Sequence, residues 1–387
     1  MKLADRMSRL GTETAFEVLA RAKQLEKKGK NIIHLEIGEP DFDTPKNITD
    51  AAIKALKEGW THYGPSAGLP EVREVIAKYI SKTRKINVNP DQVVVTPGAK
   101  PIMFFSILAL ANEGEEVIYP NPGFPIYESV INFVGAKAVP IKLREENDFR
   151  LDTNELKKLV TDKTKMIIIN SPQNPTGGVL TKDDLKVIAE IVLSKDIMVL
   201  SDEIYSRTLY EGEHHSISSF SGMQEKTIIL DGMSKTYAMT GWRLGYGVMR
   251  EDLAVLIAKL QTNSNSCTAS FTQRAGIECL TGPQDEASKM VAEFKKRRDV
   301  IVKGLNSIPK ISCKTPQGAF YVFPNIKQTG WNSKKLADYL LEEAGVAVLS
   351  GTSFGEYGEG YIRISYANSI ENIKKGLERI EKTLSKI

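Results

Sequence analysis

A single lysine, Lys235, lies in a short polar turn within the segment Asp231–Arg243, which reads DGMSKTYAMTGWR. The apolar run Thr227–Leu230 just before this segment predicts a buried strand, so an ammonium group near its end would lose part of its hydration. That loss lowers the pKa of a lysine and makes the neutral amine available as a nucleophile toward carbonyl groups. Lys235 is therefore a candidate for forming a Schiff base, although the local sequence also allows a solvent-exposed turn lysine.

An aldehyde cofactor with a pyridine ring and a phosphate needs more than a lysine, and a carboxylate for the ring nitrogen comes first. Asp202 directly follows the apolar run Met198–Ser201. A buried carboxylate there could keep the pyridine nitrogen protonated, which makes the ring an electron sink. Tyr205, three residues later, could hydrogen-bond the phenolic oxygen of the ring. An aspartate at this position is also a common helix N-cap, so both interpretations stay open.

Two further strand ends carry candidate contacts to such a ring. Asn174 follows an apolar strand in the sequence NSPQNPTG, and its amide could donate to the same phenolic oxygen. An Asn-Pro pair is equally common in ordinary turns. Phe124 follows Pro122 and Gly123 at another strand end and could stack on the ring, although an isolated aromatic residue is more often part of a core.

A phosphate group could bind where Gly98, Ala99 and Lys100 open a helix after the strand Val93–Thr96. The first N–H groups of a helix have no intrahelical partner, and the helix dipole favours an anion there. This turn lacks the GxGxxG pattern of dinucleotide sites and the GKS or GKT of P-loops. Arg243, eight residues after Lys235, is a second candidate anion ligand.

Arg363 lies in the sequence YIRIS, within a predicted strand whose neighbouring residues are apolar. A guanidinium group in such surroundings favours a carboxylate partner, and an amino-acid substrate supplies one. A structural salt bridge or a solvent-facing position is the alternative. The four histidines do not form a metal-ligand pattern, so we expect no metal site; they are His34, His62, His214 and His215.

These candidates need a scaffold that gathers strand ends. From Val93 onward, predicted strands alternate with glycine turns and helices, which favours an α/β fold with a large, mostly parallel mixed sheet sandwiched by helices. Ligands then gather at the carboxyl ends of the strands. Beyond residue 285 a smaller α+β unit follows, with predicted strands at Ser312–Lys314, Ala319–Phe323, Val346–Leu349 and Tyr361–Ser365. We expect a large domain at residues 46–285 and a small domain at 286–387, to which residues 1–45 contribute.

The composition is typical of a soluble globular protein. Of the 387 residues, 52 are basic and 48 are acidic, and no dense basic block stands out, so nucleic acid is an unexpected partner. Cys267, Cys279 and Cys313 are widely spaced and odd in number, which suggests neither disulfides nor zinc and favours the reducing cytoplasm. No apolar stretch is long enough to span a bilayer, so we expect no membrane role.

In six short motifs that occur in the right order, the chain resembles the class I/II aminotransferases. These are pyridoxal-phosphate enzymes of fold type I, and the resemblance is to the branch with prokaryotic aspartate, alanine and aromatic aminotransferases. It covers nearly the whole length. The motifs are Gly38–Phe42, Tyr63 with Gly68–Pro70, Asn174–Gly177, Asp202–Tyr205, Ser234–Arg243 and Arg363.

The resemblance implies roles for the candidate residues. Lys235 would hold pyridoxal 5'-phosphate as a Schiff base and shuttle the substrate proton, Asp202 would pair with the pyridinium, Tyr205 and Asn174 would hold the ring oxygen, and Phe124 would stack. Gly98, Ala99, Lys100, Ser234 and Arg243 would bind phosphate, aided by Tyr63 from the other subunit of a homodimer. Arg363, Gly38 and Asn174 would bind the substrate carboxylate.

In two positions the chain departs from the family pattern. Gly232 stands where many relatives have a phosphate-binding serine, so the phosphate should depend more on the Gly98 turn, Ser234 and Arg243. Lys100 replaces a small or amide residue, and the role of its side chain stays open.

The reaction that the resemblance implies is transfer of the amino group of an L-amino acid (aspartate, alanine or aromatic) to a 2-oxo acid such as 2-oxoglutarate. A C–S lyase or an aminocyclopropane-carboxylate synthase-like enzyme with the same fold and cofactor is the alternative. A transcriptional sensor of this fold carries a DNA-binding domain ahead of it, and Gly38 follows only one helix and one strand, so we do not expect one.

Overall fold

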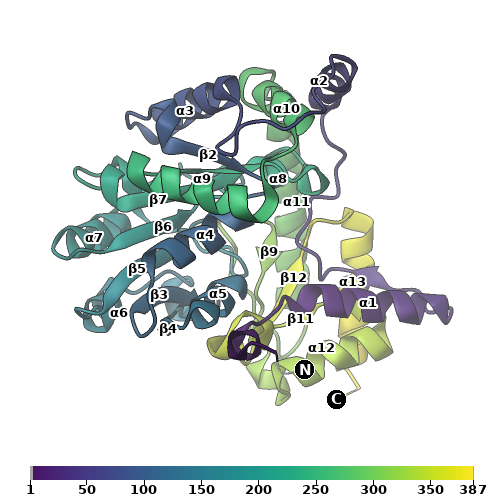
Figure 1. Cartoon of the computed structure of the whole chain (residues 1–387). Coiled ribbons are helices and arrows are strands. Elements are labelled where there is room, and N and C mark those ends of the chain that lie inside the picture. The colour runs from purple at the N-terminus through teal and green to yellow at the C-terminus, as the bar shows by residue number, and fades with distance from the viewer. Residues whose placement is uncertain (1–2, 387) are drawn as a thin grey trace.

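The computed structural model describes residues 3–386, and its centre is a seven-stranded sheet with the order β2-β8-β7-β6-β5-β3-β4 (Figure 1). All neighbouring strands are parallel except at β8, which runs antiparallel to both β2 and β7. The strands are β2 (Val93–Thr96), β3 (Glu116–Asn121), β4 (Lys137–Lys142), β5 (Thr164–Asn170), β6 (Met198–Asp202), β7 (Thr227–Gly232) and β8 (Gly245–Val248). This confirms the predicted α/β fold with a mostly parallel mixed sheet.

Helices pack on both faces of this sheet, because successive residues of a strand point to opposite faces. In β5, Ile168 packs in one apolar cluster with α4, α5 and α9, whereas Ile167 packs in another with α6 and α7. The helices of this part are α2 (Lys46–Lys57), α3 (Pro70–Arg84), α4 (Lys100–Leu110), α5 (Ile126–Val134), α6 (Thr153–Leu159), α7 (Lys182–Leu193), α8 (Met233–Thr236), α9 (Glu251–Asn265) and α10 (Ser270–Thr281).

A second unit forms around two small sheets. One is antiparallel with the order β11-β12-β9, and the other pairs β1 with β10 in parallel. Its elements are β1 (Ile33–His34), β9 (Tyr321–Val322), β10 (Val346–Ala347), β11 (Leu349–Ser350), β12 (Ile362–Ser365), α11 (Asp285–Ser307), α12 (Ser333–Tyr339) and α13 (Ile370–Leu384). Since β1 comes from the first 45 residues, the N-terminal segment shares this sheet. The exact division into domains stays a prediction.

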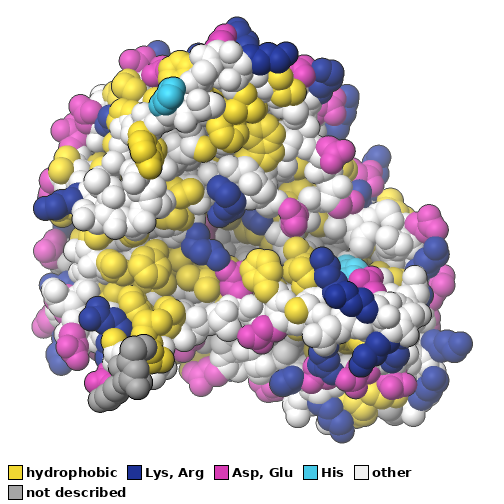
Figure 2. All heavy atoms as spheres, turned by 45° about the vertical axis from the view of Figure 1, so that its right-hand side comes forward, with side chains coloured by type: hydrophobic (Ala, Val, Ile, Leu, Met, Phe, Trp, Pro, Cys, Tyr) yellow, Lys and Arg dark blue, Asp and Glu magenta, His cyan; other side chains and the backbone are white. Residues whose placement is uncertain are grey.

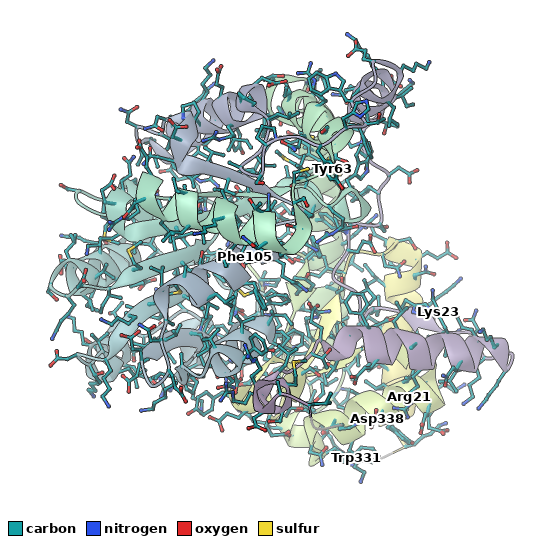
Figure 3. The ribbon with its side chains drawn as sticks, in the orientation of Figure 1. Arg21, Lys23, Tyr63, Phe105, Trp331 and Asp338 are labelled. Carbon is teal, nitrogen blue, oxygen red and sulfur yellow. The ribbon has the colours of Figure 1, made fainter. Side chains whose placement is uncertain are left out.

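The N-terminal segment connects the two parts of the molecule. Near its start, the Gly11 N–H donates to Ser129 Oγ on α5 at 2.9 Å. The helix α1 (Thr14–Lys27) then lies along the second unit, where Arg21 Nη1 donates to Asp338 Oδ1 on α12 at 2.6 Å (Figures 1 and 3). The residues between these two anchors therefore cross from one part to the other.

The predicted strand Ser312–Lys314 is wrong. Ser312 forms only an isolated bridge with Asn325, because the Cys313 N–H donates instead to Asn306 Oδ1 at the end of α11, at 2.8 Å. Three strands of the large sheet, which the sequence predicts at Val93–Thr96, Met198–Ser201 and Thr227–Leu230, lie there within two residues. Within residues 3–386, no helix combines the length and the apolar character that crossing a bilayer requires.

Candidate active site

A cavity of about 580 Å³ opens at the carboxyl ends of the strands of the large sheet. Its wall combines the large sheet, the second unit and the N-terminal segment, and Figure 2 shows the hollow between the two parts with basic side chains at its edge. The predicted site residues that line it are Gly38, Ala99, Lys100, Phe124, Asn174, Asp202, Tyr205, Ser234, Lys235, Arg243 and Arg363. The parallel sheet thus gathers most of the candidates in one place.

Lys235 lies on the short helix α8, directly after β7 ends. Its Nζ donates a hydrogen bond to the Gly38 carbonyl oxygen at 2.6 Å. Burial lowers the pKa of Lys235 to about 8, and repulsion from Arg363 and Arg243 acts in the same direction, while Glu39 opposes it. A Cβ at Gly38 would overlap the Tyr321 hydroxyl, so the close contact between Tyr321 and residue 38 requires glycine. The amine is therefore poised for nucleophilic attack near neutral pH.

We expect the pH dependence of the reaction of Lys235 with an amine-directed reagent to differ from that of exposed lysines. With a pKa of about 8, about half of its amines are neutral at pH 8, against roughly one in 250 for an ordinary exposed lysine. Its labelling should rise tenfold per pH unit below pH 8 and level off above it. Competitive labelling of the ligand-free protein with acetic anhydride, read by mass spectrometry with the exposed Lys54 as reference, measures this. Identical profiles for the two lysines would contradict the prediction.

Asp202 ends β6 with its carboxylate in the cavity wall. It accepts hydrogen bonds from the Tyr127 hydroxyl at 2.6 Å and from the Ile204 N–H at 3.2 Å. Burial raises the pKa of Asp202 to about 6, although both hydrogen bonds oppose the rise. The group is thus mainly ionised at pH 7, and a buried carboxylate of this kind suits a protonated ring nitrogen. Nothing in the sequence distinguishes Tyr127 from a core tyrosine of α5.

Tyr205 and Asn174 lie on neighbouring parts of the wall. The Tyr205 hydroxyl hydrogen-bonds the Tyr321 hydroxyl at 2.7 Å. Asn174 Oδ1 accepts from Arg363 Nη1 at 3.3 Å, and the Asn174 N–H donates to Asn170 Oδ1 at 2.9 Å. Tyr321 is a site residue that the sequence reasoning missed, because its strand β9 belongs to the second unit and carries no motif.

One corner of the cavity suits a phosphate. Gly98 adopts φ +82°, and a Cβ there would overlap the Arg243 guanidinium, so the α4 turn and Arg243 are in direct contact. The Arg243 Nη1 donates to the Thr240 carbonyl oxygen at 2.8 Å. Ser234, Ala99, Lys100 and Arg243 line the same cavity. At Gly232, a Cβ would lie 2.9 Å from the Gly245 Cα, which leaves no room for a serine without a backbone shift.

Arg363 on β12 is buried, with 4% of its surface exposed, and its guanidinium lies 4.6 Å from the Tyr321 ring centroid and 4.9 Å from that of Phe354. Its Nη2 donates to the Glu36 carbonyl oxygen, whereas its Nε has no hydrogen-bond partner among the described residues. Burial lowers the pKa of Arg363, although an arginine stays charged. An open donor on a buried cation suits a carboxylate ligand.

A buried ionic cluster behind the cavity was missed by the sequence analysis. Arg84, the last residue of α3, donates through Nε to Glu203 Oε2 at 2.7 Å and through Nη2 to Asp231 Oδ2 at 2.9 Å. Although burial opposes ionisation, Arg84 and His214 hold the pKa of Glu203 well below its usual range. Glu203 directly follows the end of β6, and Asp231 lies at the end of β7, four residues before Lys235. Arg84 therefore connects the ends of these two strands.

Replacement of Arg84 by methionine is expected to lower the free energy of unfolding by about 3 kcal/mol, because two buried carboxylates would lose their cation. Chemical denaturation followed by circular dichroism measures the change. Lys78→Met on the same helix removes an exposed cation that lies 3.8 Å from Glu74, and should cost less than about 0.5 kcal/mol. Equal losses in the two variants would show that Arg84 has no special role.

Among the predicted site residues, Gly98 and Tyr63 do not line the cavity; Gly98 directly precedes Ala99, which does, whereas Tyr63 has no neighbour in the sequence that lines it. The surface of Tyr63 is 91% exposed, it lies in the loop between α2 and α3, where Figure 3 labels it, and it is not among the residues that line the cavity. The Lys100 side chain, whose role the sequence left open, forms an ion pair with Glu13, and its Nζ lies 5.3 Å from the Phe124 ring centroid. No cluster of three potential metal ligands occurs within residues 3–386.

The described residues fit an aldehyde cofactor with a pyridine ring and a phosphate. The amine of Lys235 has a lowered pKa, the Asp202 carboxylate is buried, and the absence of a side chain at Gly98 lets the Arg243 guanidinium lie against the start of α4. The open Nε of Arg363 adds a place for a substrate carboxylate. These features occur in one cavity, as the sequence motifs imply.

Comparison with known proteins agrees with this geometry. The sequence profile of the family "Aminotransferase class I and II" matches residues 30–380. An aspartate aminotransferase of Pyrococcus horikoshii is 45% identical over 99% of this chain and 97% of its own length. Aromatic-amino-acid aminotransferase 2 of Thermococcus litoralis is 40% identical over 99% and 98%. The solved structure of alanine aminotransferase from Pyrococcus furiosus superimposes with a TM-score of 0.94 at 36% identity and covers all of both chains.

These matches confirm the family, the fold class and the cofactor that the six motifs imply. They span nearly the whole of this chain and of each relative, so they apply to the complete arrangement of sheet, second unit and cavity. The chain belongs to the class I and II aminotransferases and is a transaminase that depends on pyridoxal 5'-phosphate.

Proposed function

We propose that the protein transfers the amino group of an L-amino acid to a 2-oxo acid such as 2-oxoglutarate, with Lys235 as the residue that binds the cofactor covalently. Aspartate, alanine and aromatic amino acids are the candidate donors, which the names of the relatives support. The observation that carries the proposal is the presence in one cavity of the Lys235 amine and of a buried arginine, Arg363, with an open Nε.

Several residues would hold the cofactor. Pyridoxal phosphate, when bound, supplies an aldehyde for amines and a ring that accepts the electron pair left at the substrate Cα. Asp202 would keep the ring nitrogen protonated, because it is a buried carboxylate. Tyr205 and Asn174 would bind the ring oxygen, and Phe124 would pack against the ring. The phosphate ligands would be Gly98, Ala99, Lys100, Ser234 and Arg243, with the first three acting through the backbone at the start of α4.

The remaining groups would act on the substrate. Arg363 would bind the α-carboxylate, and the Gly38 backbone and the Asn174 amide would orient it beside Lys235, to which Gly38 is already hydrogen-bonded. The Lys235 amine would accept the proton of the substrate Cα, since its lowered pKa keeps it partly neutral. The 2-oxo acid leaves before the second substrate enters, so ping-pong kinetics are expected.

A single-turnover experiment tests the proposal against the lyase and cyclopropane-synthase alternatives. Holoenzyme is mixed with an amino donor and no 2-oxo acid. A transaminase should release one 2-oxo acid per site and then stop, because no acceptor restores the starting cofactor. Continued release of ammonia and 2-oxo acid would support a lyase, and a cyclopropane product from S-adenosylmethionine would support the synthase; either result would overturn the proposal. A profile of donors against 2-oxoglutarate then ranks the substrates.

We also propose a cytoplasmic homodimer in which Tyr63 of each subunit reaches the phosphate site of the other. The exposure of Tyr63 and its absence from the lining of the cavity of its own chain support this arrangement. Cys267, Cys279 and Cys313 are all free, in keeping with a reducing compartment.

Mixing two inactive or weakened variants tests the shared site. In a mixed dimer of Tyr63→Ala and Lys235→Ala subunits, the site with an intact Lys235 would receive an intact Tyr63 from its partner. We expect each mixed dimer to recover one site with wild-type affinity for the cofactor, whereas both parent homodimers stay impaired. If Tyr63 acted within its own subunit, mixing would recover nothing.

A further inference from the structure

An ion pair lies inside the cavity, between Glu13 of the N-terminal segment and Lys100 at the start of α4. The Glu13 side chain is 19% exposed and the Lys100 side chain is 46% exposed. Lys100 lies 5.3 Å from the ring of Phe124, the residue proposed to pack on the cofactor. The pair is therefore close to the place where a bound substrate would react.

The backbone around Glu13 fixes the position of its carboxylate. Glu13 is the N-cap residue of α1, yet its side chain makes no capping hydrogen bond and reaches Lys100 instead. On one side, the Gly11 N–H is anchored to Ser129 on α5; on the other, Arg21 is anchored to Asp338 on α12. Glu13 thus faces the cavity from a segment that is held at both ends.

The cavity that holds this ion pair also has apolar lining residues. Residues of the N-terminal segment, α4 and the second unit contribute, and they are Phe16, Ile37, Met103, Leu349 and Phe354. The other charged groups of the wall already have roles or partners. Arg363, Arg243, Lys235 and Asp202 serve the proposed carboxylate and cofactor sites, and Glu39 accepts from the Thr240 hydroxyl.

We propose that Glu13 determines the choice between acidic and uncharged amino donors. Paired with Glu13, Lys100 presents no net charge, so an apolar or aromatic substrate side chain meets a neutral ion pair and apolar lining residues. A substrate with a second carboxylate must displace Glu13 from Lys100 and is repelled by the displaced carboxylate. Glu13 therefore disfavours acidic substrates without affecting uncharged ones. This inference rests on the proposed aminotransferase function.

Binding of two unreactive carboxylic acids tests how the site treats acidic and uncharged side chains. Succinate carries a second carboxylate, and 3-phenylpropanoate carries an aromatic ring instead; neither has an amino group. Their dissociation constants for the holoenzyme are measured by the absorbance change of the bound cofactor. We expect Glu13→Gln to tighten succinate by about tenfold and to change 3-phenylpropanoate by less than about twofold. Glu17→Gln removes the same charge from the exposed surface of the same helix and should change neither.

A second variant tests the other half of the pair. Lys100→Met keeps the backbone N–H at the start of α4 and removes the ammonium group, so the ratio of the succinate dissociation constant to that of 3-phenylpropanoate should rise about tenfold. Equal changes for both acids in Glu13→Gln, or no change, would overturn the inference. A wild-type protein that shows no absorbance band on addition of pyridoxal phosphate would instead refute the proposed function, so the two failures are distinguishable.

Discussion

Replacement of Lys235 by alanine is expected to lower the rate of amino transfer by about 10⁴-fold or more, because the proposed function assigns to this one residue both the nucleophile for the cofactor and the group that moves the Cα proton. The amine lies inside the cavity with its pKa lowered to about 8. Lys100, the other lysine of the wall, is paired with Glu13.

The measurement combines kinetics with spectroscopy. The visible absorbance band of the holoenzyme should shift or disappear in Lys235→Ala, and borohydride reduction followed by peptide mapping should label Lys235 in the wild type alone. Lys235→Arg is the matched control, since it keeps the positive charge without a nucleophilic amine and should be as inactive as the alanine variant. A label on another residue, or retained activity in either variant, would contradict the assignment.

Replacement of Arg363 by lysine is expected to lower kcat/KM by on the order of 10²- to 10³-fold for both the amino acid and the 2-oxo acid. A lysine provides a point charge and cannot present the planar, bidentate donor pair of a guanidinium group. It also loses the cation–π contacts of the guanidinium with the Tyr321 and Phe354 rings. Most of the loss should appear in KM, because both substrates carry the same α-carboxylate.

Steady-state kinetics with each substrate varied in turn give the two KM values. Arg298→Lys is a suitable control: Arg298 is equally buried and paired with Glu211, but it lies outside the cavity. That variant should lose stability without a change in KM. A similar KM for wild type and Arg363→Lys would show that the substrate carboxylate binds elsewhere.

Much of the site could be predicted from local sequence, because its main residues follow apolar strands. Lys235 and Phe124 each follow a strand of the large sheet and Asp202 ends one, and parallel strands bring their carboxyl ends to one edge. Their gathering in one cavity is therefore a consequence of the alternating pattern that also predicts the fold.

The site residues that the sequence analysis missed are placed by contacts between distant parts of the chain. Arg84 ends α3 in the charged sequence KTRK, which reads as an exposed helix end, yet Lys85 adopts φ 58° there and Arg84 enters the core toward two acids more than 100 residues away. Tyr321 and Glu13 reach the cavity only because the second unit and the N-terminal segment pack over the sheet. Contacts across such separations depend on tertiary packing, on which local patterns carry no information.

The antiparallel strand β8 affects how the two proposed attachments of the cofactor depend on each other. Because β7 and β8 are hydrogen-bonded neighbours, with Gly232 opposite Gly245, the chain leaves and re-enters the sheet at the same edge. Lys235 and Arg243 both lie in the single segment that connects β7 to β8. The proposed covalent attachment and the proposed phosphate ligand therefore belong to one connection. A distortion of this segment that moved Lys235 would also move Arg243, so both proposed contacts to the coenzyme would weaken together.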